Sequence, residues 1–176
     1  MAELESVIVA GGCFWCTEAV FLPLRGVETV ESGYIGGSIP NPSYEAVCTG
    51  RTGHAEGVRI AFDPDVIGLD QLLDIFFATH DPTQLNRQGN DVGTQYRSAL
   101  FPADDAQRAA MEAAIARAND IWDGKVVTTI EPMDIFYVAE AYHQNYFARN
   151  PGQPYCAAIV APKVAKARAS YGALMK

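Results

Sequence analysis

The residues best suited to chemistry lie near the start of the chain, where a pair of glycines (11–12) immediately precedes Cys13. The apolar run at 7–10 predicts a buried strand, and the residues that follow predict a helix over about 13–22. Glycines allow a sharp turn between these elements, so Cys13 is expected at or near the helix N-terminus. Unpaired N–H groups and the helix dipole favour an anion there, and the thiolate is the nucleophilic form of cysteine.

Cys16 follows one helical turn later and completes a Cys-x-x-Cys pair, for which three interpretations are open. The pair suits a redox-active dithiol at a helix start. It also supplies half of a zinc site, but structural zinc needs a second pair or suitably spaced histidines. The other cysteines and the histidines stand apart in the sequence: Cys48, Cys156, His54, His80 and His143. The third interpretation, two small buried side chains, does not explain the two glycines before the pair.

The composition restricts the class of protein. The chain has 176 residues, of which 49% are hydrophobic and 19% charged, as is typical of one globular domain. A net charge of -8 without a basic cluster argues against a nucleic-acid partner. No stretch reaches the roughly 18 apolar residues of a membrane helix, and the acidic start is unlike a secretory signal. We therefore expect a cytoplasmic protein with no membrane partner, acting on a small molecule or another protein.

Interleaved strand and helix patterns predict one domain over residues 1–176, of the α/β (α+β) class, with helices covering a sheet. The expected strands are 27–34, 58–62, 96–101 and 126–130, and the expected helices are 69–77, 103–118 and 140–149. The polar segment 83–94 is long for a loop, and such loops are often functional. Residues 150–176 are expected to form a partly flexible C-terminal tail with a short helix over about 164–174.

Several motifs, in the same order, resemble those of the methionine sulfoxide reductase A family, which reduces the S epimer of methionine sulfoxide. They are GCFW (12–15), GYIGG (33–37), NPSY (41–44), TGHAE (52–56), HDPT (80–83), RQGNDVGTQYRS (87–98) and AEAYHQ (139–144). The match spans about residues 5–160 and is far more specific than a lone Cys-x-x-Cys. The resemblance implies a two-layer sandwich with a mixed central sheet flanked by helices, a ferredoxin-like core, and no metal or organic cofactor.

The resemblance assigns catalytic roles to four residues. A sulfoxide sulfur becomes electrophilic only when its oxygen is polarised or protonated, so the reaction needs a thiolate, an acid and an apolar seat for the methyl group. Cys13 matches the nucleophile and Glu56 the acid, whose role requires a raised pKa such as an apolar pocket provides. Tyr44 and Tyr96 match the tyrosines whose hydroxyls hold the oxygen as hydrogen-bond donors.

Three further residues match the substrate-binding positions of the family. Phe14 and Trp15 are expected to hold the methyl group, and Asp91 to meet the polar backbone side of the substrate. Taken alone, Phe14 and Trp15 are explained equally well as core residues, Tyr44 and Tyr96 as half-buried tyrosines, and Glu56 as a solvated surface charge. The ordered motifs around them favour the functional interpretation. The three histidines are expected to be hydrogen-bonded scaffold residues.

A second thiol is needed because attack on the sulfoxide leaves Cys13 as a sulfenic acid, which condenses with a nearby thiol to a disulfide. Many family members have glycine where this chain has Cys16, and use cysteines in the tail instead. This chain has only Cys156 in its tail. Cys16 is the expected first resolving cysteine because it lies one helical turn away, and Cys156 is the alternative or a relay. Cys48 is expected to be a spectator.

The expected function is thioredoxin-dependent reduction of methionine S-sulfoxide, free and in proteins, and thus repair of oxidised proteins. Thioredoxin or another dithiol is the expected external reductant. One alternative is a general dithiol–disulfide oxidoreductase, which needs only Cys13 and Cys16. A second is a module that binds oxidised methionine without reacting, for which neither a nucleophile nor an acid is needed.

Overall fold

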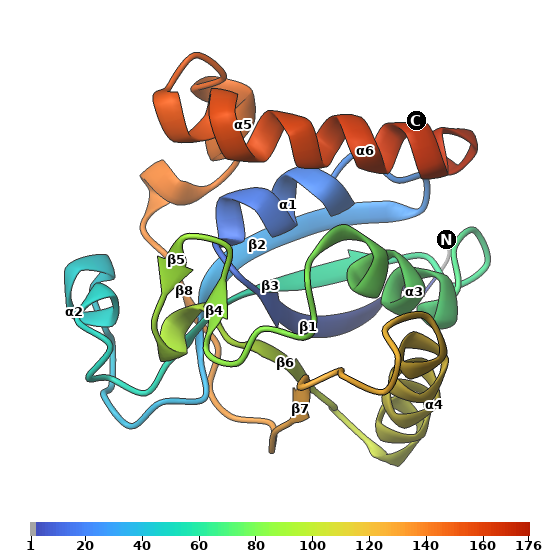
Figure 1. Cartoon of the computed structure of the whole chain (residues 1–176), viewed down its shortest axis with the longest axis horizontal. Coiled ribbons are helices and arrows are strands. Elements are labelled where there is room, and N and C mark those ends of the chain that lie inside the picture. The colour runs from blue at the N-terminus through green and yellow to red at the C-terminus, as the bar shows by residue number, and fades with distance from the viewer. Residues whose placement is uncertain (1–2) are drawn as a thin grey trace.

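A six-stranded sheet forms the centre of the molecule, with the strand order β7-β6-β1-β3-β2-β8 (Figure 1). The structure, a computed structural model, describes residues 3–176. The strands of this sheet are β1 (Glu5–Gly11), β2 (Val27–Ile35), β3 (Ala55–Phe62), β6 (Ser98–Phe101), β7 (Thr129–Ile130) and β8 (Tyr137–Val138). Neighbouring strands are antiparallel except β6 and β7, which are parallel, so the sheet is mixed.

Helices flank this sheet and complete a ferredoxin-like core. They are α1 (Phe14–Phe21), α2 (Tyr44–Cys48), α3 (Leu69–Thr79), α4 (Asp105–Ile121), α5 (Tyr146–Arg149) and α6 (Ala161–Tyr171). The series β1-α1-β2-β3-α3-β6 has the spatial strand order β6-β1-β3-β2, which is the ferredoxin-like arrangement. Helix α1 packs against β2 and β3, and α3 packs against α4. The predicted fold class is confirmed.

Strand β1 is central in the sheet, which explains the continuous apolar run in its sequence. Val7 and Val9 belong to the main core, while Ile8 and Ala10 belong to a second buried cluster. Successive side chains of a strand point to opposite faces, so β1 is buried from both sides. This burial fixes the direction in which the chain leaves the sheet toward α1.

The turn between β1 and α1 requires a glycine at position 12. Gly12 has a φ of +90°, a conformation that L side chains rarely adopt. A Cβ atom at this position would also lie 2.8 Å from Cγ of Gln88, closer than real contacts allow. The turn therefore depends on the second glycine of the pair, and it sets Cys13 at the N-cap of α1.

The C-terminal segment is helical and lies over α1 rather than over the sheet (Figure 1). A π-helical turn at Cys156–Val160 leads directly into α6, which begins at Ala161, a few residues earlier than the sequence predicts. The expected flexibility of residues 150–176 stays a prediction. Within residues 3–176, no helix is long and apolar enough to cross a bilayer.

Two other segments differ from their predicted secondary structure. The helix predicted over 140–149 is wrong: a 3-10 turn, Ala141–His143, and the short helix α5 replace it. The break follows from Asn145, whose φ of 56° is left-handed, and from Gln144, whose side chain binds the backbone of β2. The polar loop over 83–94 contains a small hairpin formed by β4 (Arg87–Gln88) and β5 (Asp91–Val92).

Candidate active site

Cys13 occupies the predicted position at the start of α1. It is the N-cap residue, with extended backbone (φ -61°, ψ 129°), and only 7% of its surface is exposed. Its carbonyl oxygen accepts the backbone N–H groups of Cys16 (3.1 Å) and Thr17 (3.4 Å), which are the first bonds of the helix. The Cys13 side chain is thus held at the end of α1 where the helix dipole is positive.

Glu56 is a buried carboxyl group beside this helix end. It lies on β3 and is 1% exposed. Its Oε1 accepts the N–H of Phe14 at 3.2 Å, and its Oε2 has no partner among the described residues. Burial raises the pKa of Glu56 to about 8, although the hydrogen bond from Phe14 acts in the opposite direction. The group therefore carries a proton at neutral pH.

The position of Cys13 at a helix N-terminus predicts a thiol that ionises easily, but the structure indicates the opposite. Burial raises the pKa of the Cys13 thiol well above its usual range, and the negative charge of Glu56 raises it further. The helix terminus is a local feature, whereas burial and Glu56 come from the tertiary structure. Cys13 is accordingly a thiol at rest, and a protonated Glu56 removes one of the charges that oppose its ionisation.

Tyr44, the first residue of α2, and Tyr96, at the end of a 3-10 turn, approach Cys13 and Glu56 from separate parts of the chain. Burial raises the pKa of both phenols, and the charges of Glu56 and Cys13 add to this effect. Both hydroxyls therefore remain protonated and able to donate hydrogen bonds. They also lie against Cys48, whose pKa is raised mainly by burial while the two tyrosines act in the opposite direction, so this exposed cysteine lies at the edge of the site.

Aromatic rings form one wall of the site. Trp15 stacks on Tyr146, with 3.9 Å between ring centroids and 8° between planes. Its Nε1–H donates to Nδ1 of His143 at 3.0 Å, which holds the indole in place. Phe14 is fully buried, with its ring 6.4 Å from that of Tyr44, whereas Trp15 is partly exposed. Of the two predicted methyl-binding residues, Trp15 is thus the more accessible.

Asp91 joins the site through Tyr155. The Tyr155 hydroxyl donates a hydrogen bond of 2.5 Å to Oδ2 of Asp91 and lies 4.0 Å from Sγ of Cys16. Asp91 and Tyr155 also line a groove of about 420 Å³ between the β4–β5 hairpin and the π-helical turn. The structure therefore brings Asp91 near both cysteines of the pair, across more than sixty residues of sequence.

Cys16 and Cys156 lie in one apolar cluster, together with Ala19 and Val160. Cys16 is 3% exposed and Cys156 is fully buried. Burial is the largest cause of the raised pKa of each thiol. All the cysteines are free in this structure. The two predicted resolving cysteines thus lie together, with Cys16 also adjacent to Cys13 along α1.

Sequence reasoning missed two residues that support the site. Glu140 accepts the hydroxyl of Tyr34 (2.8 Å) and the backbone N–H of Tyr44 (2.9 Å), and so ties α2 to β2. Tyr155 was not singled out, although its position next to Cys156 in the sequence was a usable signal. Glu140 lies within a motif that marks the family but carries no sign of this contact.

The histidines are buried and hydrogen-bonded, as expected of scaffold residues. His80, for example, bonds the carbonyl of Phe76 (2.5 Å) and the hydroxyl of Ser98 (2.8 Å). His54 bonds the backbone of Gly37 at 3.0 Å. Within residues 3–176, no group of three or more His, Cys, Asp or Glu side chains is placed to hold a metal ion.

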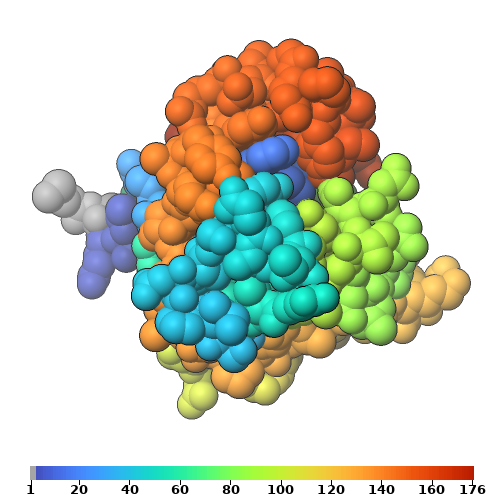
Figure 2. Space-filling view, turned by 90° about the vertical axis from the view of Figure 1, so that its left-hand side faces the viewer, coloured from blue at the N-terminus to red at the C-terminus, as the bar shows by residue number. Residues whose placement is uncertain are grey.

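Figure 2 shows the face of the molecule at which these segments meet. Blue atoms from the region of α1 are visible there, surrounded by teal atoms around α2, orange atoms of the later chain and yellow-green atoms of the β4–β5 region. Three segments distant in sequence thus border the region of α1. Part of the α1 region reaches the surface at this face, whereas Glu56 is buried.

Comparisons with known proteins support the family resemblance that the sequence motifs indicate. The family model described as peptide methionine sulfoxide reductase matches residues 5–174. The peptide methionine sulfoxide reductase MsrA of Clavibacter michiganensis subsp. michiganensis is 60% identical over 168 residues, covering 96% of each chain.

Solved structures agree with the sequence matches. Reduced Mxr1 from Saccharomyces cerevisiae is similar with a TM-score of 0.82 and 38% identity, over 86% of this chain and 88% of that one. A second structure, of Mxr1 in complex with Trx2, has a TM-score of 0.59 and 27% identity, over 82% and 85% of the two chains. On the family match and these identities, the chain belongs to the peptide methionine sulfoxide reductase family.

Proposed function

We propose that the site reduces methionine S-sulfoxide, free and in proteins, with Cys13 as nucleophile and Glu56 as acid. The observation that carries this proposal is a buried, protonated carboxyl group beside a cysteine at a helix start. An acid with a pKa of about 8 holds its proton at neutral pH and gives it up readily to a developing oxyanion. A general dithiol oxidoreductase needs only Cys13 and Cys16, and a binding module needs neither a nucleophile nor an acid.

In the first step, the sulfur of Cys13 and the sulfoxide exchange oxygen and two electrons. Glu56 donates its proton to the sulfoxide oxygen, while Tyr44 and Tyr96 donate hydrogen bonds to it. Cys13 attacks, the substrate leaves as methionine, and the oxygen remains on Cys13 as a sulfenic acid. The proton lost by the thiol restores Glu56. Trp15 is placed to contact the methyl group, and Asp91 the polar backbone of the substrate.

In the second step, Cys16 attacks the Cys13 sulfenic acid, forms a disulfide and releases water. Thioredoxin then reduces the disulfide, as the complex of the relative Mxr1 with Trx2 supports. No metal or organic cofactor takes part in either step. The proposal includes a cytoplasmic location, because a reducing compartment maintains free thiols of this kind.

A single-turnover experiment tests the proposal. Reduced protein without external reductant is mixed separately with the S and R epimers of a peptidyl methionine sulfoxide. The expected result is about one equivalent of methionine from the S epimer alone, and loss of two thiols that peptide mass mapping assigns to a Cys13-linked disulfide. Glu56→Gln in parallel separates the alternatives, since a general disulfide reductase is indifferent to this change. Folded, reduced protein that yields no methionine from either epimer contradicts the proposal.

A further inference from the structure

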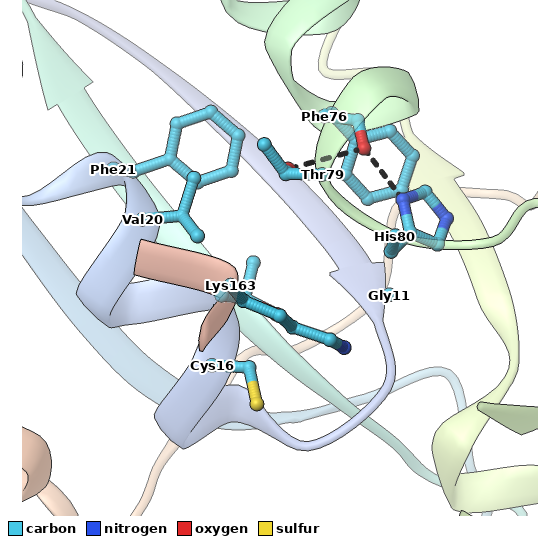
Figure 3. A pocket seen from close by; sticks show the side chains of 9 residues that line it. Gly11, Cys16, Val20, Phe21, Phe76, Thr79, His80 and Lys163 are labelled. Carbon is cyan, nitrogen blue, oxygen red and sulfur yellow. Dashed lines mark hydrogen bonds between the residues drawn. The ribbon is translucent and has the colours of Figure 1, made fainter. Parts of the chain in front are cut away.

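A small cavity lies between α1, α3 and α6, next to Cys16 (Figure 3). Its volume is about 10 Å³, which is at the lower limit for a single water molecule. Cys16 and Val20 line it from α1, Phe76 from α3, and Lys163 from α6. Lys163 also lines the groove that holds Asp91 and Tyr155, so its charge reaches the Cys16 sulfur across the cavity but is partly screened by solvent.

Lys163 is the charged residue of this cavity. In Figure 3 its side chain extends between the Cys16 sulfur and the ring of His80. Burial lowers the pKa of His80 to about 4, so His80 is neutral at physiological pH. Of the described side chains that line the cavity, Lys163 is then the one that carries a charge. None of the ion pairs among residues 3–176 involves Lys163.

We propose that Lys163 acts on Cys16 through this cavity, stabilising its thiolate and so making Cys16 the resolving sulfur. The proposal rests on the proposed function, because it deepens the second step of that reaction. Lys163 is a positioning residue in this scheme, since it acts on the reaction through Cys16.

The other groups facing Cys16 show why a cation is needed. Burial raises the pKa of Cys16, and the nearby Asp91 and Cys156 add to this effect. Lys163 is the strongest influence in the opposite direction, followed by the hydrogen bond of Tyr155. The pKa of Cys16 stays raised with Lys163 present, and loss of this cation would raise it further. The neutral His80 contributes no charge to this balance at physiological pH.

The step that Lys163 assists is balanced within the protein. Cys16 loses its proton, and its thiolate attacks the sulfur of the Cys13 sulfenic acid. The S–O bond breaks, and the oxygen leaves as water with a proton equivalent to the one that Cys16 lost. When an external dithiol later attacks Cys13, Cys16 is the leaving group, and the same cation stabilises the departing thiolate.

The test compares Lys163→Met and Lys163→Arg with Lys166→Met. Lys166 is a matched control because it lies on the same helix but lines a different groove, with Asp74 and Trp122. Rapid mixing with a peptidyl methionine S-sulfoxide separates methionine formation from disulfide formation across a pH series. Thermal melting shows that each variant is folded.

For Lys163→Met we expect methionine formation to keep the pH dependence of the wild type, and the midpoint for disulfide formation to rise by about one pH unit. The rate at neutral pH should fall about threefold, because lost thiolate is partly offset by greater nucleophilicity. Lys163→Arg should remain close to the wild type, and Lys166→Met should not move the midpoint. An unmoved midpoint in Lys163→Met, or an equal shift in Lys166→Met, overturns the proposal.

A second measurement keeps this proposal separate from the proposed function. Thiolate absorbance is titrated in Cys13→Ser protein, and the Cys13→Ser/Cys16→Ser curve is subtracted to isolate Cys16. Adding Lys163→Met should shift this difference curve to higher pH, whether or not the wild type reduces any sulfoxide. An unchanged curve refutes the role of Lys163 even if the reductase activity is confirmed.

Discussion

Cys13 and Cys16 lie one turn apart at the start of the same helix, yet their surroundings are opposite in character. Cys13 faces a buried carboxyl group and two phenols, all of which are proton donors at neutral pH. Cys16 faces an apolar cluster, with a lysine ammonium at the adjacent cavity. The helix dipole acts on both cysteines, so the contrast between them must come from residues outside α1.

The contrast divides the reaction between the two sides of the helix start. Reduction of a sulfoxide requires a proton at the substrate oxygen, which the Cys13 side supplies. Disulfide formation requires only a thiolate, and a fixed cation on the Cys16 side favours it. Four substitutions test this division, and we consider them in order of decreasing effect.

Cys13→Ser should have the largest effect, because it removes the nucleophile on which both half-reactions depend. We expect methionine formation to fall to the uncatalysed background in single-turnover and thioredoxin-coupled assays. The change is nearly isosteric, so the melting temperature should stay close to that of the wild type. Substantial methionine formation by folded Cys13→Ser protein would show that another residue attacks the sulfoxide.

Glu56→Gln should slow methionine formation by about 10²- to 10⁴-fold, the usual contribution of a positioned acid. The amide retains an acceptor for the N–H of Phe14, so folding should survive. In the wild type, the rate should fall as the pH rises through about 8, where Glu56 loses its proton. This decline should be absent in Glu56→Gln, and quenched-flow rates across a pH series measure it.

The same substitution should change how stability depends on pH. The pKa of Glu56 is raised in the folded state, so the folded protein binds more protons than the unfolded chain between about 4.5 and 8. Stability from this group is complete below the unfolded pKa and is lost as the pH rises through the folded pKa, by about 1.4 kcal/mol per pH unit. Urea unfolding of Glu56→Gln should lack this decline. Parallel curves for the two proteins would show that Glu56 is ionised in the folded state.

Some features of the fold could be predicted from the sequence, and others could not. The glycine pair before Cys13 locates the helix start, because a left-handed turn is a local requirement. The ferredoxin-like core likewise accords with the order of strand and helix patterns and the family motifs. By contrast, Asn145 adopts a left-handed conformation that breaks the predicted helix, and Gln144 stabilises the break by binding a strand far away in sequence.

The electrostatics of the site were predicted only in part, since the raised pKa of Glu56 follows from the role that the resemblance implies, whereas the pKa of Cys13 does not. The helix position of Cys13 suggested a lowered pKa, but burial acts the other way, as does Glu56 when it is ionised. The effect of Lys163 on Cys16 depends on how α6 lies over α1, and no pattern in the sequence encodes that approach. Local geometry was thus predictable, whereas charges contributed by distant elements were not.

Cys16→Ser should separate the two half-reactions. We expect about one equivalent of methionine per protein, because Cys13 and Glu56 are untouched, but loss of thioredoxin-driven turnover. Mass spectrometry of the reacted protein should then find oxygen on Cys13 in place of a Cys13–Cys16 disulfide. Full thioredoxin-driven turnover in this variant would instead make Cys156 the first resolving residue.

Cys156→Ser should have the smallest effect on activity, and this outcome is the sharpest test of the division. Cys156 is fully buried beside Cys16, so a hydroxyl there lacks a polar partner and should cost about 1–3 kcal/mol of stability. Thioredoxin-driven turnover should nevertheless stay within about twofold of the wild type below the melting transition, a difference on the scale of a few tenths of a kcal/mol. If turnover stops while the Cys13–Cys16 disulfide still forms, Cys156 relays electrons from the external reductant. A Cys13–Cys16 disulfide would then form first, and exchange with Cys156 would convert it to a second disulfide on the apolar side of α1. Burial of this side would protect the first disulfide from the external reductant until that exchange.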